Sequence, residues 1–377
     1  MRATGFLVPL VAGLVWVLAQ PVTAQMTTSD RCGSCHRDIF KMWRASKHAD
    51  SVEGAAFLES FRQSQVAWGD DRSRVCLDCH APMIAETGDW ELREKVTWEG
   101  VSCDVCHSLV DVDLSGHGPR MQLEFGPIKR GPIIGAESTG HEVAYSPLHE
   151  KSLACAPCHE YASADGVPIM TTFSEWQNSQ AAADGTTCQD CHMWRTKANI
   201  VDPRVKRIER AEVNLHEMPG GRSLHQLVKA LDIEYDLVRT KEGIDVVVRI
   251  ANVTGHAVPT GMPSREIILT VEVAAAETAR QIDQRIFGKS FVDASGKPVE
   301  YTWGFFETGV RVDKDTRLAA DSEWTETLSY SLPDDATAYF KIRLEYRNAM
   351  AEMQYEATRF EFFSERRTVK RGSGRLR

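Results

Sequence analysis

The pattern of hydrophobic and polar positions divides the chain into three parts. Residues 5–18 form an apolar run that only small residues and Pro9 interrupt. Over residues 32–192, helical periodicity is rarely sustained, and Gly, Pro and Asp are frequent. From Leu227 onward, β-branched residues are enriched and polar and apolar positions partly alternate, which is typical of strands in a half-buried sheet.

The last part of the chain predicts a β-rich domain over residues 227–365. The predicted strands are residues 244–253, 266–273, 326–332 and 339–346. Residues 293–298 (DASGKP) predict a turn, and residues 223–231 a helical stretch. We expect a small antiparallel β-sandwich. Such a domain could dock or shield a neighbouring domain, or only stabilise the fold, and the sequence does not decide between these roles.

The amino-terminal run predicts a cleaved signal peptide over residues 1–24. Arg2 gives a positive start, and Val22-Thr23-Ala24 resembles a small-residue cleavage site before Gln25. The alternative is an uncleaved anchor, but the run is shorter than the roughly 20 apolar residues that span a bilayer. We expect a periplasmic or otherwise exported protein with no transmembrane segment after cleavage.

The charge of the chain excludes one class of partner. The formal net charge is −9, whereas general nucleic-acid binding calls for a basic surplus. Residues 366–377 are a local exception, since six of these twelve residues are Lys or Arg. They predict a basic tail, which is either simply solvated or an electrostatic handle for an acidic partner.

Cysteine usage identifies the chemistry. All ten cysteines lie in five copies of CxxCH, so none remains for a disulfide or a thiol catalyst. The copies comprise Cys32, Cys35 and His36; Cys76, Cys79 and His80; Cys103, Cys106 and His107; Cys155, Cys158 and His159; and Cys188, Cys191 and His192. This motif attaches haem c covalently: the two thiols reach the vinyl groups of one porphyrin, and the histidine meets the iron. Zinc sites built from CxxC pairs would not need a histidine after every second cysteine.

The spacing of the motifs implies that cofactor replaces much of the core. Five haems attach within residues 32–192, in a pentahaem cytochrome c domain that we place at residues 25–226. We expect a mainly helical and irregular domain in which haems pack against one another and against Trp43, Trp90, Trp98 and Trp176. Without haem this domain should not fold.

Seven further histidines are candidates for the second axial position of the irons. The stronger candidates are His48, His141, His149, His216 and His256. His117 is a weaker candidate, and His225 falls in the predicted helix, where a solvated side chain is the simpler interpretation. Met83, Met193 and Met218 could also ligate an iron, but packing is the simpler role for each.

Beyond CxxCH, several stretches resemble one family of exported multihaem cytochromes. They include Trp43-x-x-Ser46-x-His48-Ala49, Glu99-Gly100-Val101-Ser102-Cys103, His216-x-x-Pro219-Gly220-Gly221 and residues 255–261 (GHAVPTG). Over residues 30–265 the chain resembles the group related to the tetrahaem cytochrome c that accepts electrons from hydroxylamine oxidoreductase. The resemblance implies stacked haems, many of them with two histidine ligands, although some relatives keep one haem five-coordinate. Related nitrite reductases attach their catalytic haem through a motif that ends in Lys, whereas all five motifs here end in His.

These observations favour a periplasmic electron carrier with five covalently bound haem c groups and no catalytic residue. An acidic chain suggests a basic redox partner that docks transiently. Two alternatives remain: an enzyme that reduces or oxidises a small nitrogen or sulfur compound at one open haem, with His117 or Arg120 as a nearby donor, and a subunit of a haem filament. The sequence does not identify the electron donor, the acceptor or the oligomeric state.

Overall fold

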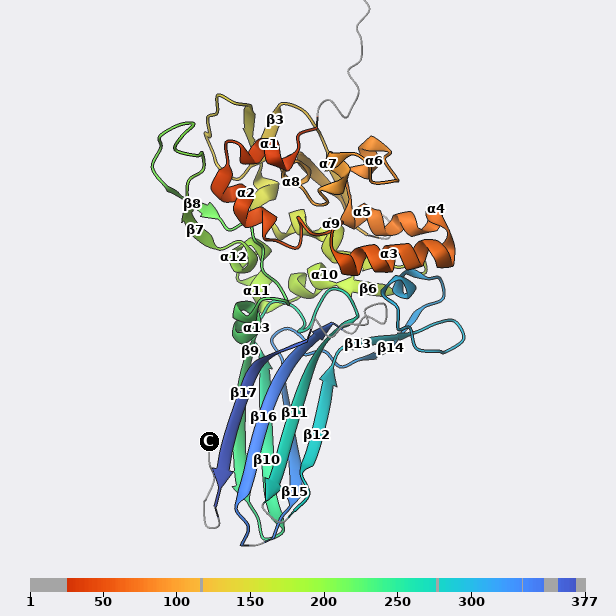
Figure 1. The fold of residues 1–377 in the computed structure, drawn as a ribbon, viewed down its shortest axis with the longest axis vertical. Coiled ribbons are helices and arrows are strands. Elements are labelled where there is room, and N and C mark those ends of the chain that lie inside the picture. Colours follow the sequence, from red (N-terminus) through yellow and green to blue (C-terminus); the bar gives the residue numbers. More distant parts are fainter. Residues whose placement is uncertain (1–25, 116–117, 276–277, 334, 349–358, 371–377) are drawn as a thin grey trace, which may run out of the picture.

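A computed structural model describes residues 26–115, 118–275, 278–333, 335–348 and 359–370. The amino-terminal half is built from short helices and irregular segments, and the carboxy-terminal half from long antiparallel strands that extend away from it (Figure 1). The predicted signal peptide lies outside the described residues. None of the helices in the described ranges has the length and apolar character needed to cross a bilayer.

The helices of the first half are mostly of one or two turns. They are α1 (Ser29–Gly33), α2 (Arg37–Arg44), α3 (Ala55–Trp68), α4 (Asp70–Ser73), α5 (Leu77–His80), α6 (Ile84–Thr87), α7 (Lys95–Trp98), α8 (Cys103–His107), α9 (Ala156–His159), α10 (Thr172–Gln177), α11 (Gln180–Ala183), α12 (Cys188–His192) and α13 (Leu224–Ala230). Short 3-10 helices add η2 (Arg74–Cys76), η3 (Pro147–Glu150), η4 (Ser152–Cys155) and, in the second half, η5 (Thr302–Phe306).

Paired strands connect these helices. They are β1 (Leu109–Asp113) with β2 (Arg120–Leu123), β3 (Ile128–Gly131) with β4 (Glu142–Tyr145), β5 (Glu160–Ala162) with β6 (Pro168–Thr171), and β7 (Arg195–Ala198) with β8 (Ala211–Asn214). Only the pair β3 and β4 is parallel. The buried apolar residues of this half form separate small clusters, such as Val52, Phe61, Leu77, Ala81 and Ile84. Among the described residues of this half, the buried apolar side chains are divided among several small clusters rather than one continuous core.

The second half contains two antiparallel sheets. One has the order β15 (Glu323–Ser331), β10 (Gly243–Asn252), β9 (Leu231–Arg239); the other has the order β12 (Gln281–Phe287), β11 (Arg265–Ala275), β16 (Ala338–Asn348), β17 (Phe360–Val369). A further pair, β13 (Lys289–Val292) with β14 (Arg311–Asp315), lies near β6, where Lys289 Nζ donates to the carbonyl of Pro168 (Figure 1). One hydrophobic core is shared by both sheets, with Val246 and Ile250 from one and Ile267, Leu269 and Ile342 from the other.

The predicted strands correspond to β10, β11, β15 and β16, and the expected turn lies at residues 294–296. Antiparallel strands in this half are therefore confirmed. At the carboxy-terminal end, β17 continues through Val369, so its last four residues belong to a strand rather than to the predicted basic tail. Residues 371–377 lie outside the described residues.

The two halves meet along a broad contact. The α3 indole of Trp68 donates to the Glu307 carboxylate at 2.6 Å and stands edge-on to Trp303, with ring centres 5.2 Å apart. Nearby, Ile169 and Met170 from β6 share an apolar cluster with Phe291 and Phe305. In the same interface, the loop that follows β10 lies against α10 and α11, which stand between the last two motifs in the chain.

Candidate functional site

Four of the five cysteine motifs lie on short helical segments: η2 with α5, α8, η4 with α9, and α12. In the first motif Cys32 lies in α1, whereas Cys35 and His36 lie in the turn that follows this helix. One helical turn places the first cysteine, the second cysteine and the following histidine on neighbouring positions of one face. Because such short helices are marginal alone, capping contributes: the Ser102 hydroxyl accepts from Val105 N, and Thr187 forms a capping box with Asp190.

Backbone carbonyl groups orient most of the motif histidines. The Nδ1 atoms of His36, His80, His107 and His192 donate to the carbonyl oxygens of Ile200, Ser51, Arg130 and Pro219, at 2.6, 2.6, 2.5 and 2.6 Å respectively. A carbonyl can only accept, so each bond fixes the proton on Nδ1 and leaves the Nε2 lone pair for a metal. The acceptors are backbone atoms far away in sequence, which no side-chain pattern could have indicated.

Four motif histidines face a second histidine across a space of nearly constant width. The ring centres are 6.0 Å apart for His36 and His141, 6.2 Å for His159 and His48, 6.4 Å for His107 and His216, and 6.2 Å for His192 and His256. A metal about 2 Å from each nitrogen, with each nitrogen roughly 1 Å from its ring centre, requires about 6 Å between the centres. The donor pairs therefore fit an iron between them, as bis-histidine haem c requires.

The facing histidines are oriented in the same way, with one exception. His141, His216 and His256 donate from Nδ1 to the carbonyl oxygens of Glu142, Asn214 and Ala257 at 2.9, 2.7 and 3.0 Å. His48 instead places Nδ1 3.0 Å from the thioether sulfur of Met218. Met218 is therefore a neighbour of a candidate ligand, while Met83 is fully buried in an apolar cluster.

His149 is arranged differently from the other predicted ligands. Its ring centre is 5.9 Å from that of His107, but its Nε2 donates to the carbonyl of Cys106 at 2.9 Å. Cys106 belongs to the third motif itself, so His149 lies on the motif's own side of the third attachment site. Its Nδ1 is buried and has no hydrogen-bond partner among the described residues.

The second motif differs from the other four. The ring neighbour of His80 is Phe57 of α3, stacked at 4.0 Å, which is too close for a metal between the rings. Phe57 therefore fixes the plane of His80 from the motif side. No histidine faces His80 among the ring contacts of the described residues, and His117 lies outside that part of the chain. His225 is exposed on α13 beside Trp194, as the sequence predicts.

Burial keeps the facing imidazoles neutral. Desolvation lowers the pKa of His159 to about 3 and the pKa values of His48 and His107 to about 4. Desolvation also lowers the pKa of His256. The neutral imidazole is the form that binds a metal, so these rings are poised for ligation at pH 7.

Thiols from different motifs lie beside one another. The thiol of Cys32 contacts that of Cys103, Cys79 contacts Cys158, and Cys155 contacts Cys188. Cys79 Sγ also lies 3.8 Å from the carbonyl of Pro157, inside the fourth motif. Among the described residues, which include all ten cysteines, none forms a disulfide. The attachment sites are thus neighbours in the pairs first–third, second–fourth and fourth–fifth.

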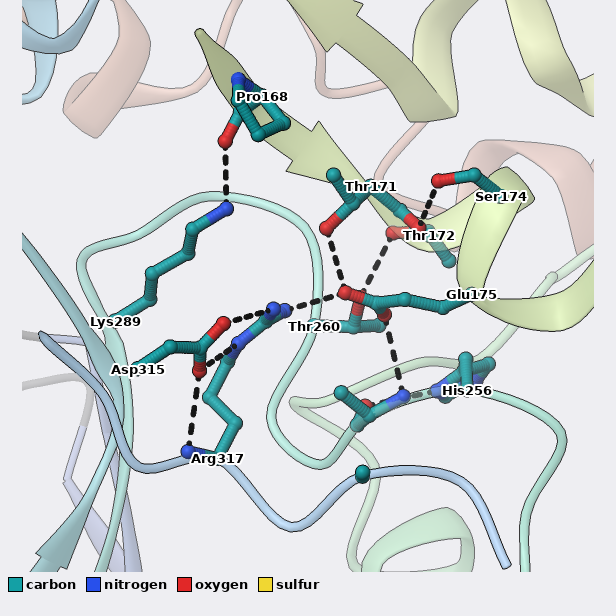
Figure 2. A network of polar contacts seen from close by, with 12 residues as sticks. Pro168, Thr171, Thr172, Ser174, Glu175, His256, Thr260, Lys289, Asp315 and Arg317 are labelled. Atoms are coloured by element: carbon teal, nitrogen blue, oxygen red, sulfur yellow. Dashed lines mark hydrogen bonds and ion pairs between the residues drawn. The ribbon is translucent and has the colours of Figure 1, made fainter. Parts of the chain in front are cut away.

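A buried carboxylate connects the fifth site to the β-rich half (Figure 2). Glu175 in α10 accepts from the Thr171 hydroxyl at 2.6 Å and from Arg317 Nη1 at 2.7 Å on one oxygen. On the other oxygen it accepts from the Thr260 hydroxyl at 2.6 Å and from Ala257 N at 3.2 Å. The carbonyl of that same Ala257 receives the Nδ1 proton of His256, so the network holds the loop that presents the candidate ligand.

Arg317 completes this network. It also binds Asp315, and its side chain is only 10 % exposed. Although burial opposes its charge, Asp315 and Glu175 together raise the pKa of the Arg317 guanidinium. Glu175 lies in one of the stretches that resemble the multihaem cytochrome family, Thr172-Phe173-x-Glu175-Trp176-x-x-Ser179, but the resemblance assigns it no role. Arg317 and Phe57 lie outside the sequence motifs, so no sequence signal indicates them.

The predicted aromatic residues take several positions. Trp43 is buried and donates to the carbonyl of Val101, and Trp176 donates to that of Thr186, both at 2.9 Å. Trp98 donates to Glu53, while Trp90 is 37 % exposed under the guanidinium of Arg74. Trp43 and Trp176 thus brace segments next to the first and fifth motifs.

The cysteine motifs and the paired histidines indicate a multihaem c-type cytochrome, and comparison with known proteins supports the same class. Residues 31–108 match the family model described as cytochrome c554 and c-prime. No curated protein matched the sequence.

The whole fold is similar to a solved structure, the penta-heme cytochrome c552 from Thermochromatium tepidum. The TM-score is 0.71 at 22 % sequence identity, and the alignment covers 93 % of this chain and 100 % of that one. The similarity therefore extends over both halves of the molecule.

Proposed function

We propose that the protein is an exported c-type cytochrome that carries five covalently attached haem c groups and transfers electrons between redox partners. The observation that carries the proposal is the spacing of the histidine pairs, 6.0–6.4 Å at four of the five motifs. Haem c closed by two histidines supplies one-electron exchange with little rearrangement. The matches to a cytochrome family model and to a pentahaem cytochrome fold support this class.

The proposed axial pairs are His36 with His141, His159 with His48, His107 with His216, and His192 with His256. For the third site we choose His216 over His149, because His149 bonds the carbonyl of Cys106 on the motif side, whereas a second ligand must come from the opposite side. His149 is therefore assigned to no iron. The ten cysteines hold the five porphyrins in thioether linkage.

The neighbouring thiols suggest the order in which redox groups follow one another. The first attachment site adjoins the third, and the fifth adjoins the fourth. Cys106 of the third motif lies close enough to Cys155 and Cys158 of the fourth for a charge on one thiol to act on the others. This gives a path from the first site through the third and fourth to the fifth, with the second site as a branch at the fourth.

Spectroscopy of the purified holoprotein tests the proposal. Five haems per chain by pyridine haemochrome assay, and low-spin ferric signals from four irons by electron paramagnetic resonance, are the expected result. Fewer than four low-spin irons, or a protein that chemical reductants cannot reduce and acceptors cannot reoxidise, would refute it.

One observation favours a second function, catalysis at the second site. His80 is faced by no histidine among the described residues, and the charge of Arg120 acts on Asp78 inside this motif. Tyr161 is close enough to Cys79 and Asp78 for their charges to raise its pKa further, after burial. A high-spin ferric signal that shifts when nitrite or hydroxylamine is added would support this function, and its absence would leave electron transfer alone.

A further inference from the structure

The loop that joins β7 to β8, residues 199–210, protrudes from the first half of the molecule (Figure 1). Every residue from 203 to 210 is exposed. This stretch carries the cations Arg204, Lys206, Arg207 and Arg210 against the single carboxylate of Glu209. Two aliphatic side chains stand among them in solvent, Val205 at 57 % and Ile208 at 37 % exposure.

The charge of this loop is opposite to that of the whole chain. The formal net charge of the protein is −9, yet residues 195–210 hold six Lys or Arg residues and two Asp or Glu residues, a local charge of +4. A partner at contact distance responds to this local charge, because the Debye length at physiological salt is about 8 Å. Arginine and exposed aliphatic groups together are a composition found at protein interfaces.

The base of the loop holds the first motif. His36 Nδ1 donates to the carbonyl of Ile200 at 2.6 Å, and Asp202 N donates to the carbonyl of Cys35 at 2.7 Å. The backbone and side-chain nitrogens of Asn199 bind the Asp38 carboxylate at 3.0 and 2.8 Å. Whatever binds the exposed end of this loop therefore lies against the first attachment site, at one end of the proposed path.

We infer that the 199–210 loop is the docking surface for an acidic redox protein, which exchanges electrons with this cytochrome at its first site. The inference rests on the proposed electron-transfer function. It differs from the basic partner that the net charge suggests, because the partner meets the loop and not the average surface. An acidic protein is preferred to an anionic membrane because the loop contacts the first motif directly, where a redox partner gains access.

The test compares two double charge reversals in the holoprotein. K206E/R207E changes the tip of the loop, where both side chains are exposed. The matched control, K341E/R366E, makes the same charge change on a cross-strand pair of β16 and β17, in the β-rich half. Stopped-flow measurements follow reduction by flavodoxin hydroquinone, an acidic one-electron donor, and flash photolysis follows reduction by a neutral deazaflavin semiquinone.

The loop variant should be reduced by flavodoxin about ten-fold more slowly than wild type at low ionic strength, and the difference should vanish in high salt. The control variant should change by less than about two-fold, and the neutral donor should reduce all three proteins equally. If flavodoxin reduced both variants equally slowly, or reduced the loop variant as fast as wild type, the loop would not be the docking surface. The same holds if the loop reversal abolishes binding to phosphatidylglycerol vesicles but leaves the flavodoxin rate unchanged. If neither donor reduces wild type, the proposed function fails instead.

Discussion

Replacing Glu175 by alanine tests whether the contact between the two halves positions the fifth site. The carboxylate accepts four hydrogen bonds, and its side chain is only 15 % exposed. Removing it takes this acceptor away from Ala257 N, Arg317 Nη1 and the hydroxyls of Thr171 and Thr260. Breaking a buried ion pair by removing one partner costs about 3–5 kcal/mol. Since Arg317 keeps its ion pair with Asp315, we expect the free energy of unfolding to fall by about 3 kcal/mol, near the lower end of this range.

Differential scanning calorimetry of the holoprotein measures this loss. A loss of about 3 kcal/mol lowers the unfolding temperature by roughly 6–12 °C in a domain of 150–250 residues. The low-spin signal of one iron should also broaden or shift, because the carbonyl of Ala257 that orients His256 is no longer fixed. E175Q, which keeps an acceptor, should restore most of that signal.

The matched control is E59A, which breaks an exposed bridge to Arg62 within α3. Exposed pairs contribute little, so this variant should unfold at the wild-type temperature. If E175A were as stable as wild type and had an unaltered spectrum, the network would have no role in holding the fifth site.

The remaining predictions concern individual ligands and charges. H256A should convert one iron to high spin in the electron paramagnetic resonance spectrum, whereas H225A should leave the spectrum unchanged; a change in the second variant would contradict the assignment of His225 to solvent. H216A should likewise open one iron, while H149A should not, and the reverse result would exchange their roles. M218Q replaces a weak thioether acceptor with a stronger carbonyl beside His48, so one reduction potential should fall in a spectroelectrochemical titration, and a rise would refute this reading. Arg359 holds the pKa of Glu345 below its usual value of 4.5, so this carboxylate stabilises the fold above that pH and the stabilisation is lost as the pH falls through the folded-state pKa. The unfolding temperature of E345Q should therefore lie below that of wild type at pH 7 and approach it near pH 3; a gap that did not narrow would argue against the ion pair.

The sequence predicts the residues that attach the haems better than it predicts which second histidine faces each motif histidine. The cysteine motifs are local, and four of the five lie on short helical segments, as one helical turn requires. The facing histidines lie far along the chain from their motif histidines, some of them more than a hundred residues away. Which histidines pair therefore depends on the tertiary fold. The sequence ranked five candidates for five irons, whereas the structure brings two of them, His149 and His216, to the same motif histidine and none of them to His80.

The strands of the second half show a similar division. The strands β10, β11 and β16 have a partner on both sides, carry β-branched residues and were predicted. The edge strand β15 was also predicted, whereas the edge strands β9, β12 and β17 were not, because charged residues interrupt the apolar alternation of these three, as in the Glu365-Arg366-Arg367 stretch of β17. At an edge these side chains reach solvent, so hydrophobicity alone does not distinguish such a strand from a tail.

The loop that carries His256 has a consequence for biosynthesis. The fifth motif is translated well before His256. The strand before that histidine, β10, belongs to a sheet completed by β15, which ends at Ser331, and the strand after it, β11, to a sheet completed by β17, which ends at Val369. If His256 is the second ligand of the fifth iron, as we propose, that iron gains it only when nearly the entire polypeptide has emerged and its carboxy-terminal half has folded. A nascent or truncated chain would then carry one iron with an open coordination position that oxygen can reach. Folding of the β-rich half would close that position.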